Sequence, residues 1–103
     1  MEEKRIKQVI WTDPAAQDLE ELYAYLEIFS SKKAQKTIDK LFEKVENLFD
    51  FPEMGAIEHW LSQPTKEYRY LVEGNYKIIY LVLKDIVSIE RVFDTRQDPN
   101  RLQ

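Results

Sequence analysis

The fold is decided by residues 68–97, YRYLVEGNYKIIYLVLKDIVSIERVFDTRQ, a stretch rich in the Ile, Val and Tyr that favour β-strands. Gly74-Asn75 lies between two apolar runs, and a two-residue loop of this type suits a hairpin turn that needs positive φ. Lys84-Asp85 interrupts the second run and indicates a further, weaker turn. The stretch therefore predicts three short strands joined by two tight turns.

The middle strand of these three has apolar side chains on both of its faces. Side chains alternate between the two faces of a strand with a two-residue period. One face carries Tyr76, Ile78, Tyr80 and Val82. The other face begins with Lys77 and is otherwise apolar. We therefore expect this strand to lie at the centre of its sheet.

Polar side chains are sparse in this stretch, and four of them are basic. They are Arg69, Lys77, Arg91 and Arg96. Such residues can contact the carboxylates of a partner protein or the phosphates of a nucleic acid. The structural alternative is that Arg69 and Arg91 pair with neighbouring carboxylates, which contributes little stability at an exposed position. Those carboxylates are Glu73, Glu90 and Asp94, and Arg96 has Asp98 nearby.

Length and composition limit the classes of protein that are possible. A chain of 103 residues with 44% hydrophobic residues is sized for a single globular domain, which we place at residues 1–103. No cysteine is present, so a disulfide framework and a thiolate metal site are excluded. His59 is the only histidine, which removes most transition-metal and histidine-based catalytic sites. We expect no metal site and no cofactor, and a His59 that is structural or exposed.

The charge distribution argues against a surface that binds nucleic acid broadly. The net charge is −4 and the pI is near 5.0, and the negative excess lies in residues 1–66, because residues 67–103 are neutral overall. Broad phosphate binding relies on clustered Lys and Arg. No apolar run approaches the roughly 20 residues of a membrane span, and the amino terminus lacks the apolar segment of a signal peptide. We therefore expect a cytoplasmic protein.

The amino-terminal part predicts a strand followed by a helix. Residues 6–11 alternate weakly between apolar and polar types, and Thr12-Asp13-Pro14 then ends the strand. Asp13 can accept a hydrogen bond from a free backbone N–H of the helix, and Pro14 suits its first position. The apolar side chains that follow have helical spacing. They are Leu19, Leu22, Tyr23, Leu26 and Phe29.

A second helix is predicted after Ser30-Ser31, where a serine can cap its amino terminus. Its apolar stripe consists of Ala34, Ile38, Leu41, Val45 and Leu48, widened by Phe42 and Phe49. A connection of a few residues makes the two helices antiparallel neighbours. The first helix is acidic and the exposed face of the second is rich in lysine. We expect a solvated surface there, with some charge pairing between the helices.

The segment FPEMG, residues 51–55, ends the second helix, and a loop then continues to about Lys66. We expect Trp60 and Leu61 in this loop to cover the edge of the core. The complete order is one strand, two helices and three strands. This order predicts an α+β domain in which a helical hairpin packs on one face of a mostly antiparallel sheet.

Four segments of the chain carry a resemblance beyond this pattern. They are WTDPAAQDLEELYAYL, FPEMG, YRYLVEGNYKIIYLV and RVFDTRQDP. Together, from about Ile6 to Leu102, they resemble the RelE/ParE family of bacterial toxins from type II toxin–antitoxin modules. The resemblance implies a small toxin that a cognate antitoxin protein holds inactive by laying an extended or helical segment across it. The Leu and Phe stripes of the helical hairpin and the sheet edge offer a groove for that segment.

The RelE-like branch of this family consists of ribosome-dependent mRNA endonucleases. Their chemistry needs an activated 2′-hydroxyl, charge stabilisation at the phosphate and a proton for the leaving oxygen. Carried over by position, this interpretation uses Arg69, Lys77 and Arg96 as catalytic residues. Lys77 stands where the branch usually has an arginine, and a lysine lacks the planar guanidinium that binds a phosphate through two hydrogen bonds. The carboxyl terminus is Arg101-Leu102-Gln103 where a tyrosine is common, and no general acid or base is evident, which weakens the nuclease interpretation.

The ParE-like branch shares the fold, lacks that catalytic set and inhibits DNA gyrase. The DPAAQDLEELYAYL helix, the FPEMG turn and the absence of a catalytic terminus fit this branch better. The resemblance then implies a binding protein rather than an enzyme, with target contacts from Arg69, Lys77, Arg91 and Arg96. A third interpretation is a family member that has lost toxicity and only binds its antitoxin. Direct sequence-specific DNA binding is not expected, because no helix-turn-helix or basic helix is visible.

Overall fold

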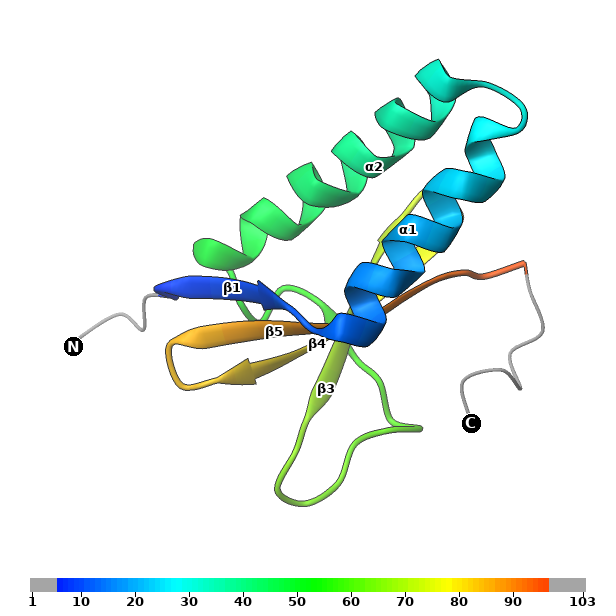
Figure 1. Cartoon of the computed structure of the whole chain (residues 1–103). Coiled ribbons are helices and arrows are strands. Elements are labelled where there is room, and N and C mark those ends of the chain that lie inside the picture. Colours follow the sequence, from blue (N-terminus) through cyan, green and yellow to red (C-terminus); the bar gives the residue numbers. More distant parts are fainter. Residues whose placement is uncertain (1–5, 97–103) are drawn as a thin grey trace.

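The computed structural model describes residues 6–96 (Figure 1). Its helices and strands follow the predicted order, with two short additions, η1 and β2. The elements are β1 (Gln8–Trp11), α1 (Asp13–Glu27), α2 (Ser31–Glu46), the 3-10 turn η1 (Asn47–Phe49), β2 (Ala56–Ile57), β3 (Tyr68–Glu73), β4 (Tyr76–Leu83) and β5 (Ile86–Asp94). The fold is α+β, as the sequence predicts.

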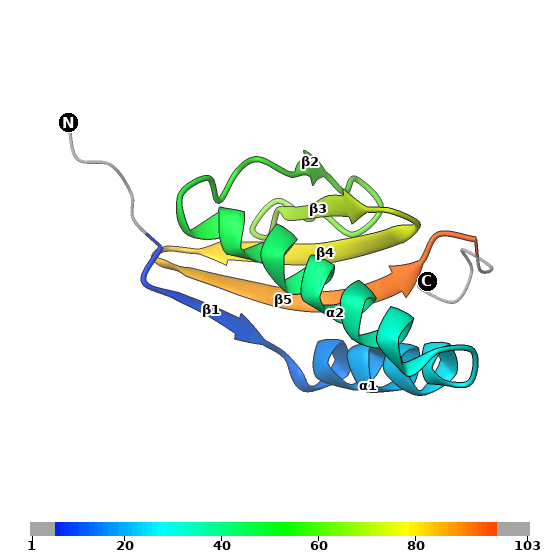
Figure 2. The same cartoon turned by 90° about the horizontal axis from the view of Figure 1, so that it is seen from above.

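The five strands form one sheet in the order β1-β5-β4-β3-β2 (Figure 2). β1 pairs with β5 in parallel, and the other three pairs are antiparallel. After β1 the chain passes through the two helices and enters the sheet again at its far edge, β2. β4 therefore lies at the centre, as its two apolar faces predict.

Both tight turns lie where the sequence predicts them. Gly74-Asn75 joins β3 to β4, and Lys84-Asp85 joins β4 to β5. Gly74 has a φ of 59°, in the left-handed region that glycine enters without steric cost. Lys84 has a φ of 53°, and a residue with a side chain adopts this conformation at a cost.

The cap of α1 is Thr12, and the prediction that Asp13 serves this role is wrong. Thr12 has an extended backbone, and its Oγ1 accepts a hydrogen bond from the Ala15 N–H at 3.3 Å. The same hydroxyl donates to the carbonyl of Ile89 in β5 at 2.9 Å, which fixes the start of α1 against the sheet. Asp13 is therefore the first residue of the helix, and Pro14 takes the second position rather than the first one that the sequence predicts.

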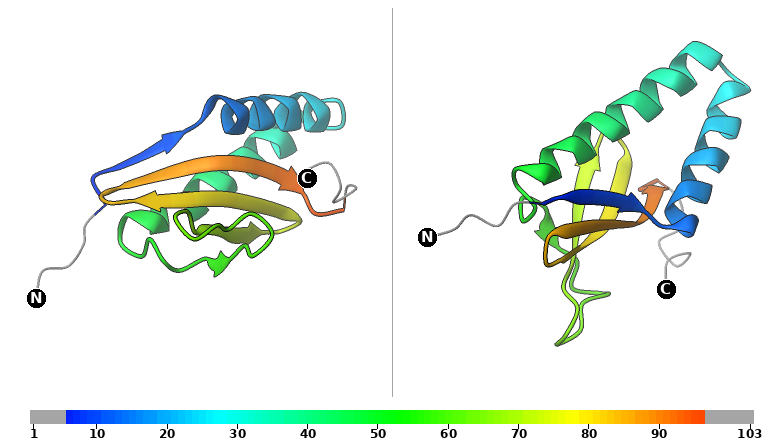
Figure 3. Two further views of the ribbon diagram at one scale, coloured as in Figure 1. Left: turned by 90° about the horizontal axis from the view of Figure 1, so that it is seen from below. Right: turned by 60° about the vertical axis from the view of Figure 1, so that its left-hand side comes forward.

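The second helix carries most of the helical contribution to the core. Ser30 caps it as predicted, because its Oγ accepts a hydrogen bond from the Lys33 N–H at 3.1 Å. α2 lies across one face of the sheet, with α1 beside it (Figures 2 and 3). The buried core between α2 and the strands contains Ile38, Leu41, Val45, Leu48, Leu71, Ile78, Tyr80, Val87, Ile89 and Val92. Within α1, only Ala15 is fully buried, so α1 flanks this core rather than filling it.

A β-bulge in β5 changes which of its side chains face the helices. The pairing of β5 with β4 shifts by one residue at Glu90, which has no partner in β4. The extra residue lets Ile89 and Val92, three positions apart, both lie in the core. A strict two-residue period would place them on opposite faces.

The face of the sheet away from the helices is partly covered by the loop between β2 and β3. Leu61 in this loop and Ile79 of β4 line the same hollow, on the face of the sheet opposite the core. Trp60 is 83% exposed, so the prediction that it covers the core is wrong. His59 is exposed, in agreement with the prediction.

The helical hairpin shows two further features. Within residues 6–96 no ion pair joins α1 to α2, so the predicted pairing between the helices is not formed. In the same part of the chain, neither helix is long and apolar enough to cross a membrane.

Candidate functional site

The four basic residues that the sequence singles out lie at different places on the sheet. Arg69 is in β3, Lys77 in β4 and Arg91 in β5, whereas Arg96 follows β5. Each of them forms an ion pair with a carboxylate of the same chain. Their surroundings decide which of them can reach a partner.

Arg69 lies on the helix-facing side of the sheet, because it pairs with Tyr80 across the ladder of β3 and β4. Its Nη1 donates to the carbonyls of Gly55 and Glu53 at 2.8 and 3.2 Å. Its Nη2 donates to Glu67 Oε1 at 3.0 Å, and the side chain is only 18% exposed. Arg69 therefore ties the turn after α2 to the sheet, and it does not pair with the carboxylates suggested by the sequence.

The same turn is held by Tyr80, the largest fully buried side chain. Its hydroxyl donates to the carbonyl of Pro52 at 2.8 Å and accepts from the Gly55 N–H at 2.9 Å. Burial raises the pKa of this phenol above its usual value. A Cβ at Gly55 would lie 2.6 Å from the Tyr80 hydroxyl and from the carbonyl oxygen of Tyr70, so a larger residue cannot enter without displacing the turn.

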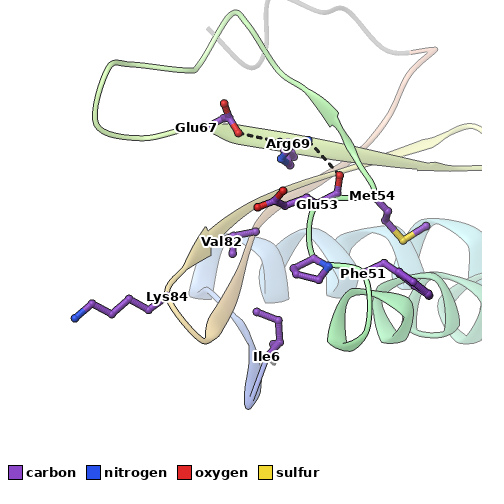
Figure 4. A pocket seen from close by; sticks show the side chains of 9 residues that line it. Ile6, Phe51, Glu53, Met54, Glu67, Arg69, Val82 and Lys84 are labelled. Carbon is purple, nitrogen blue, oxygen red and sulfur yellow. Dashed lines mark hydrogen bonds and ion pairs between the residues drawn. The ribbon is translucent and has the colours of Figure 1, made fainter. Parts of the chain in front are cut away.

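A cavity of about 640 Å³ opens beside Arg69, between this turn and the end of the sheet (Figure 4). Its lining is mostly apolar and includes Ile6, Phe51, Pro52, Met54 and Val82. Figure 4 shows the Lys84 side chain directed away from the cavity. Because Arg69 already donates to two carbonyls and a carboxylate, the cavity offers apolar surface more than charge.

Lys77 lies on the opposite face of the sheet, away from the helices. Its ammonium forms an ion pair with the buried carboxylate of Glu58, just after β2. The same nitrogen lies 4.1 Å from the ring centroid of Tyr70 and 5.9 Å from that of Phe93. A buried carboxylate is costly without a counter-charge, and aromatic faces attract a cation. Lys77 therefore holds the start of the β2–β3 loop on the sheet.

Arg91 lies on the part of β5 that extends past the end of β1. Its Nε and Nη2 donate to the two carboxylate oxygens of Asp18 in α1 at 2.8 and 3.0 Å. Asp18 also accepts a hydrogen bond from the Val92 N–H at 2.9 Å, a backbone group that β1 does not reach. The hydrogen bonds from Arg91 to Asp18 raise the pKa of Arg91. The pair joins α1 to the sheet, so the expectation of a partner on the sheet itself is wrong.

Arg96 is the most accessible of the four, with 64% of its side chain exposed. Its Nε and Nη2 donate to the carboxylate of Asp94 at 3.0 and 2.7 Å, and these hydrogen bonds lower the pKa of Asp94 below its usual value. The Thr95 N–H donates to the carbonyl of Asn75 at 2.8 Å, which places Arg96 beside the β3–β4 turn. Asp98, the partner suggested for Arg96 by the sequence, lies outside the described residues.

The three residues of the nuclease interpretation do not form one cluster. Arg69 is paired with Tyr80 on the helix-facing side, and Lys77, three positions before Tyr80 in β4, lies on the other face. Arg96 lies beyond the end of β5. Among the residues the structure describes, no group of three His, Asp or Glu side chains is placed to hold a metal ion. The terminus Arg101-Leu102-Gln103 falls outside that part of the chain.

The helical hairpin and the sheet edge form the groove that their apolar stripes predict. It has a volume of about 490 Å³ and an almost wholly apolar lining. The lining residues are Trp11, Ala16, Leu19, Glu20, Tyr23, Ile38 and Phe42. The rings of Trp11 and Phe42 meet edge to face with centroids 5.1 Å apart, so β1 and α2 close the groove together.

Comparison with known proteins assigns a family to this arrangement. Residues 9–99 match the family described as "ParE toxin of type II toxin-antitoxin system, parDE". A chain of the solved structure "Chromosomal ParDE TA system from P. aeruginosa" has a similar fold, with a TM-score of 0.69 and 22% sequence identity, over 89% of this chain and 98% of that one. A comparison with curated protein sequences gave no match. The chain belongs to the ParE toxin family of type II toxin–antitoxin systems.

Proposed function

We propose that this toxin inhibits DNA gyrase by binding to it, without catalysing a reaction of its own. The observation that carries the proposal is the position of Arg69 and Lys77 on opposite faces of the sheet, each already held by a carboxylate. Cleavage of a phosphodiester needs positive groups that converge on one phosphate. A toxin without such a cluster acts through its surface, and gyrase is the target that the ParE-like branch implies.

We propose that the four basic residues all contribute to target binding, in two roles. Arg96 and Arg91 have the more exposed side chains. The planar fork of a guanidinium can exchange an internal carboxylate for a carboxylate of gyrase or a phosphate of its DNA. Arg69 and Lys77 are largely covered, and we propose that they contribute by holding the turn after α2 and the β2–β3 loop in place.

The neutralising partner is a cognate antitoxin. We propose that one of its segments lies in the groove between β1 and the helices, with apolar side chains against Trp11 and Phe42. An amphipathic segment in an apolar groove is a common way for one protein to bind another. We also propose that the toxin acts as one domain of residues 1–103 in the cytoplasm, where it meets gyrase and the antitoxin.

Two alternatives make different predictions. A RelE-like endonuclease would cleave mRNA on the ribosome and would need Arg69, Lys77 and Arg96 for this reaction. A family member without toxicity would bind the antitoxin and leave cell growth unaffected.

Expression in bacteria, with and without the antitoxin encoded beside it, tests the proposal. We expect growth arrest that the antitoxin relieves, with a DNA-damage response and intact mRNA. Cleaved mRNA without DNA damage would support the endonuclease instead, and unaffected growth would support the non-toxic partner. An Arg96→Ala variant is expected to lose part of the toxicity while it still binds the antitoxin.

A further inference from the structure

The helical hairpin has a free end, where the chain passes from α1 to α2 (Figures 1 and 3). An exposed apolar cluster lies at this end. Tyr25, Ile28 and Phe29 are 58%, 77% and 69% exposed. The rings of Tyr25 and Phe29 pack edge to face with centroids 5.5 Å apart, so these two side chains already contact each other in the free chain. Exposed apolar clusters mark interaction surfaces. This cluster, the hairpin tip, shares no residue with the cavity beside Arg69 or the groove at Trp11.

The charges around the hairpin tip are divided by helix. Glu27 ends α1, whereas Lys32 and Lys33 lie in the first turn of α2. All three side chains are exposed, and in the described part of the chain none of them forms an ion pair.

The helix dipoles make this arrangement unfavourable in the free chain. A helix favours positive charge at its carboxyl end and negative charge at its amino end. The last turn of α1 has no basic residue, and the first turn of α2 has no acidic one. A partner that fits the hairpin tip therefore brings a positive group to Glu27 and a negative group to Lys32 and Lys33.

We propose that this partner is a second copy of the chain, which docks tip to tip across a two-fold axis near Ile28. In such an isologous contact the same patch of both copies forms the interface, and the two patches run antiparallel to each other. The end of α1 in one copy then faces the start of α2 in the other. Glu27 of each copy lies against Lys32 and Lys33 of the other copy, and the two apolar clusters are buried between them. The hairpin tip is thus complementary to a second copy of itself: opposite charges face each other, and apolar side chains pack against apolar side chains.

The size of the hairpin tip sets the strength of this contact. Three apolar side chains from each copy bury less than the roughly 1,200 Å² at which stable interfaces begin. The dimer is therefore weak and reversible. The proposal concerns self-association of the toxin and does not depend on which target the toxin inhibits.

Sedimentation equilibrium of the full chain, from about 1 μM to about 1 mM, tests self-association over the range where weak interfaces form. The average mass is expected to rise from 12.4 kDa toward twice that value. Ile28→Asp is expected to keep the chain monomeric, with an unchanged circular dichroism spectrum because the side chain is exposed. The matched control is Trp60→Asp, an equally drastic change at an exposed position in the β2–β3 loop, and it is expected to associate like the parent chain.

Charge reversal separates a tip-to-tip dimer from any other contact. Glu27→Lys makes the hairpin tip wholly basic, and the double change Lys32→Glu, Lys33→Glu makes it wholly acidic, so each variant alone is expected to be monomeric. Mixed in equal amounts, the two variants are expected to form a one-to-one dimer, because both cross contacts are then attractive.

Three results would overturn the proposal: a parent chain that is monomeric up to about 1 mM, an Ile28→Asp variant that dimerises like the parent, or charge-reversed variants that stay apart when mixed. A monomeric parent whose Ile28→Asp variant no longer binds the antitoxin would assign the hairpin tip to the antitoxin and would overturn it equally.

Discussion

Asp18 of α1 and Arg91 of β5 lie 73 residues apart in the chain and form a two-pronged ion pair, with N···O distances of 2.8 and 3.0 Å. Asp18 also accepts the N–H of Val92 at 2.9 Å. One carboxylate thus satisfies an arginine and a backbone donor on the edge of β5 that β1 leaves open. This junction is what fixes α1 to the sheet beyond β1.

Replacement of Asp18 by alanine should destabilise the fold more than any other change of an acidic residue in α1. It removes three hydrogen bonds and leaves the Val92 N–H and the Arg91 guanidinium without their partner, which we expect to lower the free energy of unfolding by about 2 kcal/mol. Urea denaturation measures the loss. The matched control is Glu20→Ala, an exposed change in the same helix that should stay within about 0.5 kcal/mol of the parent. Equal stability of the two variants would contradict the structural role of Asp18.

Much of this fold is readable from local sequence, whereas the contacts of its basic residues are not. Gly74-Asn75 and Lys84-Asp85 mark the two turns, and the apolar stripe of α2 marks the helix that fills the core. These signals are local, since turn chemistry and helical spacing act within a few residues. The partner of Arg91 is distant in the chain, and a pattern of charges near Arg91 does not reveal it.

Three other features could not be predicted from the sequence, for related reasons. Thr12 rather than Asp13 caps α1, because the choice between adjacent capping residues depends on the backbone angle at which the strand ends. The bulge at Glu90 shifts the alternation of side chains between the two faces of the sheet in β5. No residue type in that strand predicts this bulge. The sequence does not predict the burial of the Glu58 carboxylate, because the loop that follows has no periodic pattern. The one available signal is that this acidic residue directly follows the apolar Ile57.

The hydroxyl of Tyr80 should contribute measurably to stability. Tyr80→Phe keeps the buried ring but leaves the carbonyl of Pro52 and the N–H of Gly55 without their partner. We expect a loss of about 1–2 kcal/mol in the free energy of unfolding. Tyr70→Phe is the control, because in the described structure the Tyr70 hydroxyl forms no hydrogen bond and its ring still faces Lys77. If both variants unfold at the same denaturant concentration, the hydroxyl of Tyr80 does not hold the turn.

The pair of Asp94 and Arg96 should make stability depend on pH in the acid range. The hydrogen bonds from Arg96 lower the pKa of Asp94 in the folded state. The stabilisation is present above the unfolded-state pKa of about 4 and is lost as the pH falls through the lower folded-state value. Asp94→Asn should therefore melt below the parent chain at pH 7, and the difference in Tm should shrink below about pH 4. A constant difference in Tm across this range would contradict the assignment.

The groove at Trp11 should govern antitoxin affinity. Phe42 is partly exposed and packs against Trp11, so Phe42→Asp places a charge in the groove without opening the core. We expect affinity for the antitoxin to fall by at least about tenfold, which corresponds to roughly 1.4 kcal/mol. Isothermal titration calorimetry measures the change, and Phe51→Asp, an exposed position at the other cavity, serves as the control. The groove assignment would be wrong if Phe51→Asp weakened binding and Phe42→Asp did not.

The most direct test of the account is DNA supercoiling by purified gyrase in the presence of the toxin, beside ribosome-dependent cleavage of a translated mRNA. We expect the toxin to block supercoiling or to trap cleaved DNA, the antitoxin to reverse this effect, and the mRNA to stay intact. Cleaved mRNA with normal supercoiling would contradict the account and would make Arg69, Lys77 and Arg96 candidates for catalysis despite their separation on the sheet.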